Sequence, residues 1–189
     1  MRLRLSLAVV MLTFGITLGA LSAETIRADN LVIRDGLLFK KFTDTPFTGK
    51  VVGETIATLQ HGKPIGTILE FYKSGVLKGK FSVIDGFREG TTSYFWENGK
   101  IMSSRNFKKG KLDGLYVDYF QDGNIQTQSN WKEGTLEGLV LQYYLNGQLL
   151  RKGNFKEDVR DGRWSRYNPD GTIDKKHTGI YEKGEKISD

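Results

Sequence analysis

The sequence predicts an all-β protein, built as an elongated antiparallel meander of β-hairpin repeats of about 24 residues each in a single twisted sheet. Two glycine series predict it. The first repeats every 24 residues at Gly66, Gly90, Gly114, Gly138 and Gly162. The second keeps the same period as the last residue of SG, NG or DG dipeptides, at Gly75, Gly99, Gly123, Gly147 and Gly171. An unbroken period of this length is typical of a repeat array.

Four columns of large apolar residues run in step with the glycines. Two of them are adjacent and mostly aromatic: Phe71, Phe95, Tyr119, Tyr143 and Tyr167, and Tyr72, Trp96, Phe120, Tyr144 and Asn168. The others are Leu77, Ile101, Ile125, Leu149 and Ile173, and Val83, Phe107, Trp131 and Phe155. Short aromatic and β-branched stretches on both sides of a DG or NG dipeptide indicate one hairpin in each repeat.

The turn type decides which columns share a side of the sheet. A two-residue type I′ turn at Asp122 and Gly123 would place Phe120 opposite Ile125, and hence the columns that begin at 72 and 77 on the same side. A three-residue bulged turn would shift this register. The glycines of the first series are expected to end the loops that join one hairpin to the next.

The chain begins with a pattern typical of a signal peptide. Arg2 and Arg4 precede an apolar run that ends in small residues, so residues 1–23 are expected to be removed, with cleavage after Ala23 or after Ala20. An uncleaved N-terminal anchor is the alternative. No later stretch is expected to cross a membrane.

The remaining residues divide into three parts. Residues 24–61 are expected to form capping strands and a degenerate repeat that closes the edge of the array. Residues 62–184 are the repeat array itself, and residues 185–189 are expected to be frayed. With about eleven or twelve strands roughly 4.8 Å apart, the ribbon would be about 50 Å long.

The composition limits the classes of function. The 28 Lys and Arg residues exceed the 22 Asp and Glu residues by six, or by four after loss of Arg2 and Arg4, and both signs are mixed at the repeat junctions. This favours a solvated rim and makes nucleic acid an improbable partner. The chain has no cysteine. Disulfides, thiolate metal sites and a lipid-anchored cysteine are therefore excluded.

Catalytic motifs are absent from the sequence. The two histidines, His61 and His177, lie near opposite ends of the array, and glycine clusters are explained by turns. Acid pairs such as Asp158 and Asp161 lie in a connection, where turn chemistry explains them. We therefore expect no enzyme, no cofactor and no bound metal.

Exposed aromatic residues give the strongest functional signal. Residues 71 and 72 are adjacent and should point to opposite sides of a sheet whose two faces cannot both be buried, so some of these rings are expected to be exposed. Both columns could instead pack along their own ladders. We expect one face to bind a partner protein through the following candidates: Tyr72, Tyr94, Trp96, Tyr116, Phe120 and Tyr144.

The repeat closely resembles the MORN repeat, in particular its bacterial variant. The pattern of an aromatic residue, a short charged stretch, glycine, an aromatic-rich strand and DG or NG is met in FKKGKLDGLYVDYFQDGN, residues 107–124, and the resemblance covers residues 62–184. It implies a non-catalytic array of β-hairpins. MORN repeats are associated with phospholipid contact and with assembly scaffolds.

The stretch PFTGKV, residues 46–51, followed by such repeats also resembles the bacterial YwqK-family antitoxins. This resemblance implies toxin neutralisation by direct binding. A cytoplasmic antitoxin would not need the export signal seen here, so the expectation becomes a periplasmic or extracellular protein that binds a toxin or another envelope protein, as an immunity protein would. The alternative is a structural module that contacts lipid headgroups, cell-wall glycan or an envelope assembly.

Overall fold

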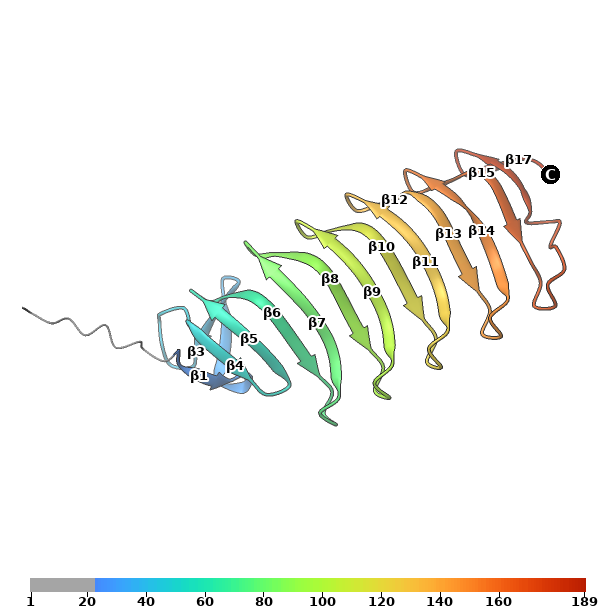
Figure 1. Cartoon of the computed structure of the whole chain (residues 1–189). Coiled ribbons are helices and arrows are strands. Elements are labelled where there is room, and N and C mark those ends of the chain that lie inside the picture. The colour runs from blue at the N-terminus through green and yellow to red at the C-terminus, as the bar shows by residue number, and fades with distance from the viewer. Residues whose placement is uncertain (1–22) are drawn as a thin grey trace, which may run out of the picture.

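The computed structural model describes residues 23–189 as an elongated array of hairpins laid side by side (Figure 1). The predicted signal peptide lies outside the described residues apart from Ala23. Within residues 23–189 the fold is all-β apart from one short 3₁₀ turn, η1 (Ala28–Asn30). The strands are β1 (Thr25–Arg27), β2 (Leu31–Arg34), β3 (Leu37–Lys40), β4 (Gly49–Val52), β5 (Thr55–Gln60), β6 (Lys63–Phe71), β7 (Leu77–Ile84), β8 (Phe87–Phe95), β9 (Ile101–Lys108), β10 (Lys111–Tyr119), β11 (Ile125–Lys132), β12 (Thr135–Leu136), β13 (Gly138–Tyr143), β14 (Leu149–Lys156), β15 (Val159–Arg166), β16 (Gly179–Glu182) and β17 (Glu185–Ser188).

The strands form one 15-stranded sheet and a separate two-stranded sheet. From β4 onward the chain runs as an antiparallel meander, as the repeats predict, in which the short β12 and the following β13 both pair with β11. The sheet is mixed because β1 pairs parallel with β4. The second sheet is the hairpin β2–β3. The strands at the two ends of the array, which have no aromatic columns, bring the count above the expected eleven or twelve.

The tight turns that contain the SG, NG and DG dipeptides are three-residue bulged turns. In the repeat that contains Gly123, the Gly123 N–H donates to the Phe120 carbonyl at 2.9 Å, and the Phe120 N–H donates to the Asn124 carbonyl at 2.8 Å. Tyr119, rather than Phe120, therefore lies opposite Ile125. Of the two turns considered, the three-residue turn is the one present, so the columns that begin at 71 and 77, and not those that begin at 72 and 77, share a side of the sheet.

Two-residue turns lie at the opposite edge of the array. There, pairs such as Asp85 and Gly86 both have positive φ, of 52° and 82°, as a type I′ turn requires. The turns at residues 109–110 and 133–134 repeat this geometry with Lys and Glu in the first position. The short reversals expected between hairpins are therefore present, but each is a two-residue turn that ends well before the next glycine of the first series.

The first glycine series lies within the strands rather than at the ends of loops. Gly90 has a φ of +74° and lies where the pairing of β8 with β7 changes register, between Glu89 and Ser93. Gly162 has a φ of +71° at the matching place in β15. An L residue rarely adopts this conformation, so the period of glycines is a period of β-bulges.

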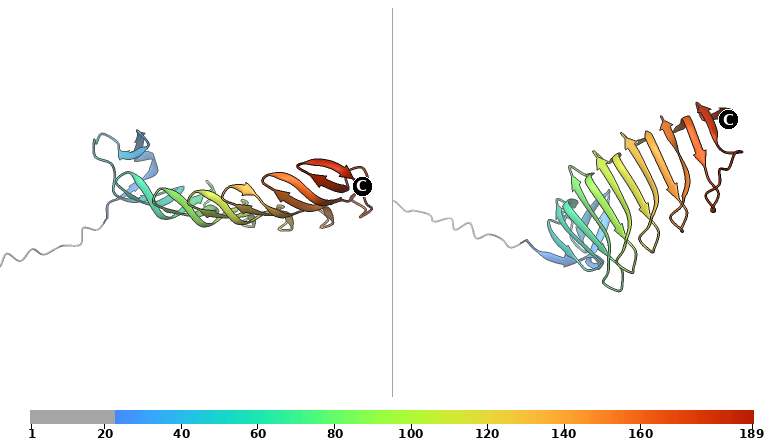
Figure 2. Two further views of the ribbon diagram at one scale, coloured as in Figure 1. Left: turned by 90° about the horizontal axis from the view of Figure 1, so that it is seen from above. Right: turned by 45° about the vertical axis from the view of Figure 1, so that its right-hand side comes forward.

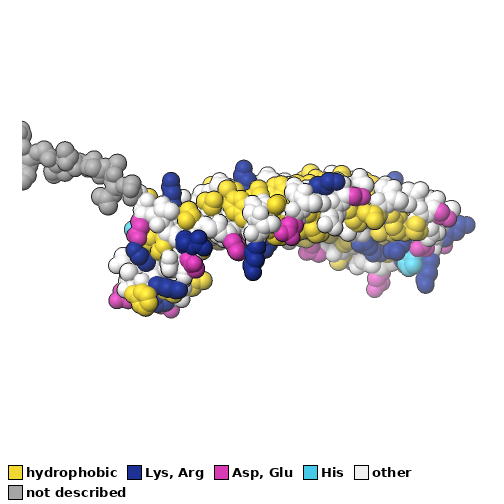
Figure 3. All heavy atoms as spheres, turned by 90° about the horizontal axis from the view of Figure 1, so that it is seen from below, with side chains coloured by type: hydrophobic (Ala, Val, Ile, Leu, Met, Phe, Trp, Pro, Cys, Tyr) yellow, Lys and Arg dark blue, Asp and Glu magenta, His cyan; other side chains and the backbone are white. Residues whose placement is uncertain are grey.

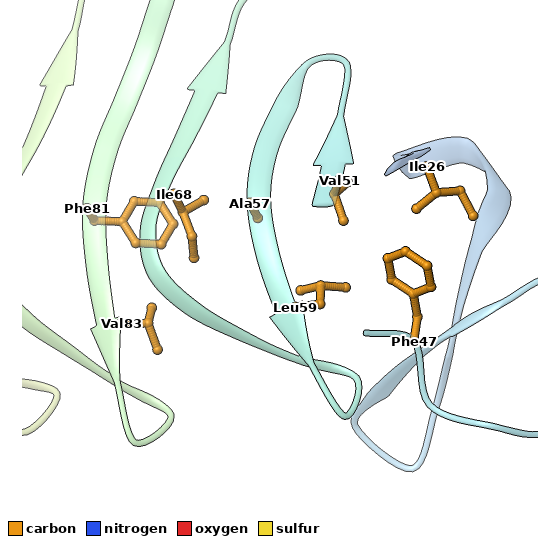
Figure 4. Close-up of a cluster of buried hydrophobic side chains, with 8 residues drawn as sticks. All are labelled: Ile26, Phe47, Val51, Ala57, Leu59, Ile68, Phe81 and Val83. Atoms are coloured by element: carbon orange, nitrogen blue, oxygen red, sulfur yellow. The ribbon is translucent and has the colours of Figure 1, made fainter. Parts of the chain in front are cut away.

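The N-terminal end of the sheet is covered on one face. Seen from above, the hairpin β2–β3 stands on one side of the ribbon (Figure 2, left). Beneath it lies the larger apolar cluster, against which Leu31 and Leu38 of the hairpin pack (Figure 4). Its buried members are Ile26, Phe47, Val51, Ala57, Leu59, Ile68, Phe81 and Val83.

We call the side that carries this hairpin the cap face and the opposite side the open face. Residues paired across neighbouring strands point to the same side, so the register carries the cap face from Ile68 and Phe81 along the array. In β8 to β10 it places Tyr94, Arg105 and Tyr116 on the cap face.

The C-terminal end is ordered to its last strand. Residues 185–188, expected to be frayed, form β17, which pairs with β16. The smaller apolar cluster lies here and contains Val140, Trp164 and Tyr181, with Leu136 and Phe155 packed against it. The ring of Trp164 is 5.1 Å from that of Phe155 and nearly perpendicular to it, at 87°.

Candidate partner-binding face

Four of the predicted site residues lie at the tight turns and not on a sheet face. Tyr72, Trp96, Phe120 and Tyr144 each open one of these turns and are half-buried. This corrects the prediction that all six candidates share one face. The three-residue turn removes these residues from the strand pairing that would have given them a side of the sheet.

Two of the turn aromatics join neighbouring hairpins. The Tyr72 hydroxyl donates to the carbonyl of Phe95 at 2.8 Å, and the Tyr144 hydroxyl donates to the carbonyl of Tyr167 at 2.9 Å. The indole Nε1 of Trp96 is buried without a hydrogen-bond partner among the described residues. Figure 3 shows hydrophobic side chains along this side of the array. These contacts indicate that the turn aromatics stabilise the stacking of repeats.

The other two candidates, Tyr94 and Tyr116, are brought together on the cap face by an arginine between them. The guanidinium carbon of Arg105 lies 5.4 Å from the Tyr94 ring centre and 4.9 Å from the Tyr116 ring centre. Both distances are in the range of cation–π attraction. The Nε atom of Arg105 is buried and has no hydrogen-bond partner in the described part of the chain.

A second arginine continues this arrangement toward the N-terminal end. Arg88 lies 4.3 Å from the ring centre of Phe81 and 5.7 Å from that of Phe107. Its Nη1 donates to the Tyr94 hydroxyl at 2.8 Å. Arg88 therefore packs on Phe81 of the apolar cluster beneath the hairpin, and its hydrogen bond orients Tyr94 beside Arg105.

The carboxylate of Asp118 lies beside Arg105 and Tyr116. Burial raises the pKa of the Asp118 carboxyl above its ordinary value, although Tyr116 and Arg105 both favour its charged form. Burial also raises the pKa of the Tyr116 phenol, and the charge of Asp118 raises it further. The middle of the cap face is thus a partly desolvated polar surface, on which electrostatic contacts are stronger than in water.

A second group of arginines lies on the cap face near the C-terminal end. Arg160 lies 4.8 Å from the Trp164 ring centre and 5.3 Å from the Tyr181 ring centre. Arg151 lies 6.0 Å from the Trp164 ring centre and is paired in register with Arg166. Arginine and aromatic side chains therefore contact one another in two groups on the cap face, one on β8 to β10 and one on β14 to β16.

The open face differs in character. Its central row mixes polar residues, such as the paired Lys80 and Ser93, with Leu69, Val117 and Leu141, and it contains no arginine. At the edge with two-residue turns, Ile84 and Phe87 are each 56% exposed and line a shallow hollow of about 460 Å³ together with Lys108 and Lys109. This hollow was not expected from the sequence, because neither residue belongs to an aromatic column.

The arginines of the cap face were also missed by sequence reasoning. They form no continuous column: the positions equivalent to Arg105 are Phe81, Ser129 and Gly153, and Leu112 and Leu136 lie between Arg88 and Arg160 in theirs. A signal was nevertheless present. Alternation along one strand puts Ser103, Arg105 and Phe107 on one side, and pairing puts Tyr94 beside them, so a correct register would have revealed the stack.

The described residues contain no group of three or more His, Asp or Glu side chains placed to hold a metal ion. Within 23–189, no helix is long and apolar enough to span a membrane.

Three of the repeats resemble a known repeat family. Residues 88–109, 112–133 and 136–157 each match the family model described as MORN repeat variant. No curated protein matched the chain. The three matched stretches cover β8 to β14 and include the Tyr94, Arg105 and Tyr116 stack. The central part of the array therefore consists of consecutive repeats similar to the MORN repeat variant.

Proposed function

We propose that this chain is a non-catalytic binding module of the cell envelope that holds a partner protein on its cap face. The observation that carries the proposal is the stack of Tyr94, Arg105 and Tyr116, which lies beyond the N-terminal hairpin and is therefore not covered by it. Tyrosine and arginine are the residue types most enriched at the energetic centres of protein interfaces.

The arginines on this face are already ordered in the free chain. Arg88 is held by two aromatic rings and by the Tyr94 hydroxyl, and Arg105 is held between two rings. A side chain that is fixed before binding loses less conformational entropy when the partner arrives. Arg88, Arg105, Arg151, Arg160 and Arg166 outnumber the two strand carboxylates that share the face, Glu70 and Asp118, so the partner we propose is acidic at its contact surface.

The proposal places the protein outside the cytoplasm. The signal-peptide pattern of residues 1–23 supports export, and the absence of cysteine excludes a lipid anchor. Cell fractionation with N-terminal sequencing tests this location. We expect a chain that begins at Glu24, or at Leu21 if cleavage follows Ala20, in the envelope or extracellular fraction. An intact chain that begins at Met1 in the cytoplasm would contradict the proposed location.

The partner that we propose is a toxin or another envelope protein. The resemblance of residues 46–51 and the following repeats to YwqK-family antitoxins supports an immunity-like role. Expression of the captured partner alone should then arrest growth, and co-expression of this chain should restore it. A partner that is harmless when expressed alone would exclude this role and leave the binding function in place.

A second candidate function is contact with lipid headgroups, cell-wall glycan or an envelope assembly. The row of arginines on one face favours it, because a basic stripe is what an anionic surface would require. Aromatic rings lie against Arg88, Arg105, Arg151 and Arg160, however, and a flat membrane cannot enter between them. We therefore favour a protein partner with side chains that project into the face.

The experiment that tests the proposal is capture from an envelope fraction by the mature chain. Arg105→Gln should abolish recovery of a stoichiometric protein, with Arg88→Gln as a second variant on the same face. Lys80→Gln removes one positive charge from the open face and serves as the matched control. Equal recovery by Arg105→Gln and Lys80→Gln, or recovery of lipid or glycan alone, would overturn the proposal.

A further inference from the structure

A small crevice near the C-terminal end of the cap face is lined by three arginines. It has a volume of about 30 Å³, and its walls are Arg151, Arg160, Trp164, Ser165, Arg166 and His177. Trp164 forms the floor, since it is only 2% exposed. Three guanidinium groups therefore surround one space that is about the size of a few atoms.

Each guanidinium is fixed by a contact that leaves other donors unused. The Nε of Arg151 donates to Oε1 of Gln142 at 2.6 Å. Arg160 is held against the rings of Trp164 and Tyr181. The Nε of Arg166 lies 3.4 Å from Oδ2 of Asp174. Because a guanidinium has five N–H donors, each of the three retains hydrogen-bonding capacity for a ligand.

The charges around the crevice do not balance. Asp174 is the carboxylate that contacts it, and Asp174 also binds Nδ1 of His177 at 2.7 Å. Burial lowers the pKa of the Arg151 guanidinium, and the charges of Arg160 and Arg166 lower it further. A bound anion would relieve this repulsion between like charges.

We propose that this crevice holds one carboxylate of an acidic peptide segment, and that the segment belongs to the protein partner of the cap face. The inference rests on the proposed function for the identity of the partner. The planar guanidinium matches the two oxygens of a carboxylate. The small volume suits the end of an Asp or Glu side chain better than a phosphodiester headgroup, which has more atoms on both sides of its charge.

The position of the crevice defines the length of the segment. Arg105 is in β9 and Arg151 is in β14, four strand steps away along the order β9, β10, β11, β13 and β14. At about 4.8 Å per step this is roughly 20 Å, the span of about six extended residues. A single extended segment with acidic residues about six positions apart could therefore contact both arginine groups.

The test is the binding of a fluorescently labelled short polyglutamate peptide to the mature chain, followed by anisotropy. Arg166→Gln should weaken binding about tenfold, and Arg151→Gln should do the same, because each removes one charged donor from the crevice. Lys152→Gln, which removes a charge from the open-face neighbour of Arg151, should leave the affinity unchanged. Circular dichroism confirms that each variant is folded, and Arg166→Lys should restore part of the affinity by returning the charge without the fork.

Several outcomes would overturn the inference. These are no binding of polyglutamate to the unmodified chain, equal affinity for the variants and the control, or binding of anionic phosphatidylglycerol vesicles at the crevice without binding of the peptide. The proposed function fails separately. If Arg105→Gln abolishes partner capture but polyglutamate does not bind, the cap face is supported as the binding surface and the carboxylate site in the crevice is rejected. If polyglutamate binds as expected and no partner is captured, the carboxylate site stands alone.

Discussion

The covered end and the uncovered middle of the array use equivalent positions for different purposes. Under the hairpin β2–β3, two of these positions hold Ile68 and Phe81, which belong to the apolar cluster. One repeat later they hold Thr92 and Arg105. The backbone repeats, but beyond the hairpin these two positions are polar, with Thr92 only 1% exposed and Arg105 held between two tyrosine rings. A repeated sheet can thus carry a core at one end and a binding surface in the middle, because the bulges and turns alone specify its shape.

The largest expected effect comes from opening the covered end. Leu59 is 2% exposed in the cluster beneath the hairpin, so Leu59→Ala should lower the free energy of unfolding of this region by about 2–5 kcal/mol. Amide hydrogen exchange should become faster in β4 to β6 and change little in β13 to β15. Uniform acceleration over all strands would show that the array unfolds as one unit and that the two regions are not separable.

A glycine-to-alanine change that overpacks the site should distinguish the C-terminal cluster from the middle of the array. A Cβ atom added at Gly153 would lie 2.2 Å from the ring of Trp164, whereas one added at Gly79 would lie 3.2 Å from the ring of Tyr94. Gly153→Ala should therefore destabilise the protein by about 1–3 kcal/mol through overpacking. Gly79→Ala should have a smaller effect in urea unfolding. Equal effects would mean that Trp164 can move aside, and hence that the floor of the crevice is not fixed.

The turn edge allows a direct comparison between two neighbouring repeats. Tyr72→Phe removes the hydrogen bond to Phe95 and should cost about 1 kcal/mol. Trp96→Phe removes an indole N–H that has no partner among the described residues, so thermal unfolding should change less. A larger loss for Trp96→Phe would indicate that the Trp96 ring contributes more by its packing than its unpaired N–H costs.

The pH dependence of stability should reveal the partly desolvated polar surface in the middle of the array. The raised pKa of Asp118 means that the folded chain binds this proton more tightly than the unfolded chain. Asp118 therefore favours the folded state most below the ordinary carboxyl pKa of 3.8, and this contribution is lost as pH rises through the raised value. Asp118→Asn should raise the melting temperature at neutral pH, and the difference should shrink in acid. Asp122→Asn, in an exposed tight turn, is the control for loss of a charge.

The smallest expected effect is at a buried hydroxyl. Ser103 is 1% exposed, and its Oγ has no partner in residues 23–189. Ser103→Ala should leave the free energy of unfolding unchanged or raise it slightly, because no hydrogen bond is lost. Ser129→Ala should instead destabilise, since Ser129 Oγ accepts from Trp131 Nε1 at 3.0 Å. A clear loss of stability in Ser103→Ala would reveal a bound water or another partner at this hydroxyl.

Much of the architecture could be predicted from the sequence because periodic residues specify local geometry. Glycines 24 residues apart identified the repeats, and the DG and NG dipeptides located one hairpin in each. The register could not be predicted, because the same dipeptide serves a two-residue and a three-residue turn, and the difference moves Phe120 out of the strand. That one-residue difference also explains the errors in the candidate site.

The candidate site could be predicted only in part. Tyr94 and Tyr116 were identified as aromatic residues near a sheet face, but Arg105 between them was not, because it replaces Phe81 in its column. The arginine crevice depends on Gln142 and Asp174, which lie on neighbouring parts of the chain and each hold one of its arginines. Contacts of this kind break the repeat and become visible only after the strands are paired.

Site-specific photocrosslinking in living cells tests the central claim most directly. A photoreactive residue at Thr127 would lie on the cap face, and one at Gln128 would lie on the open face of the same strand. If the partner binds the cap face, we expect a discrete protein adduct from position 127 and none from position 128. An adduct formed only from position 128, or the same adduct from both positions, would contradict a binding surface on the cap face.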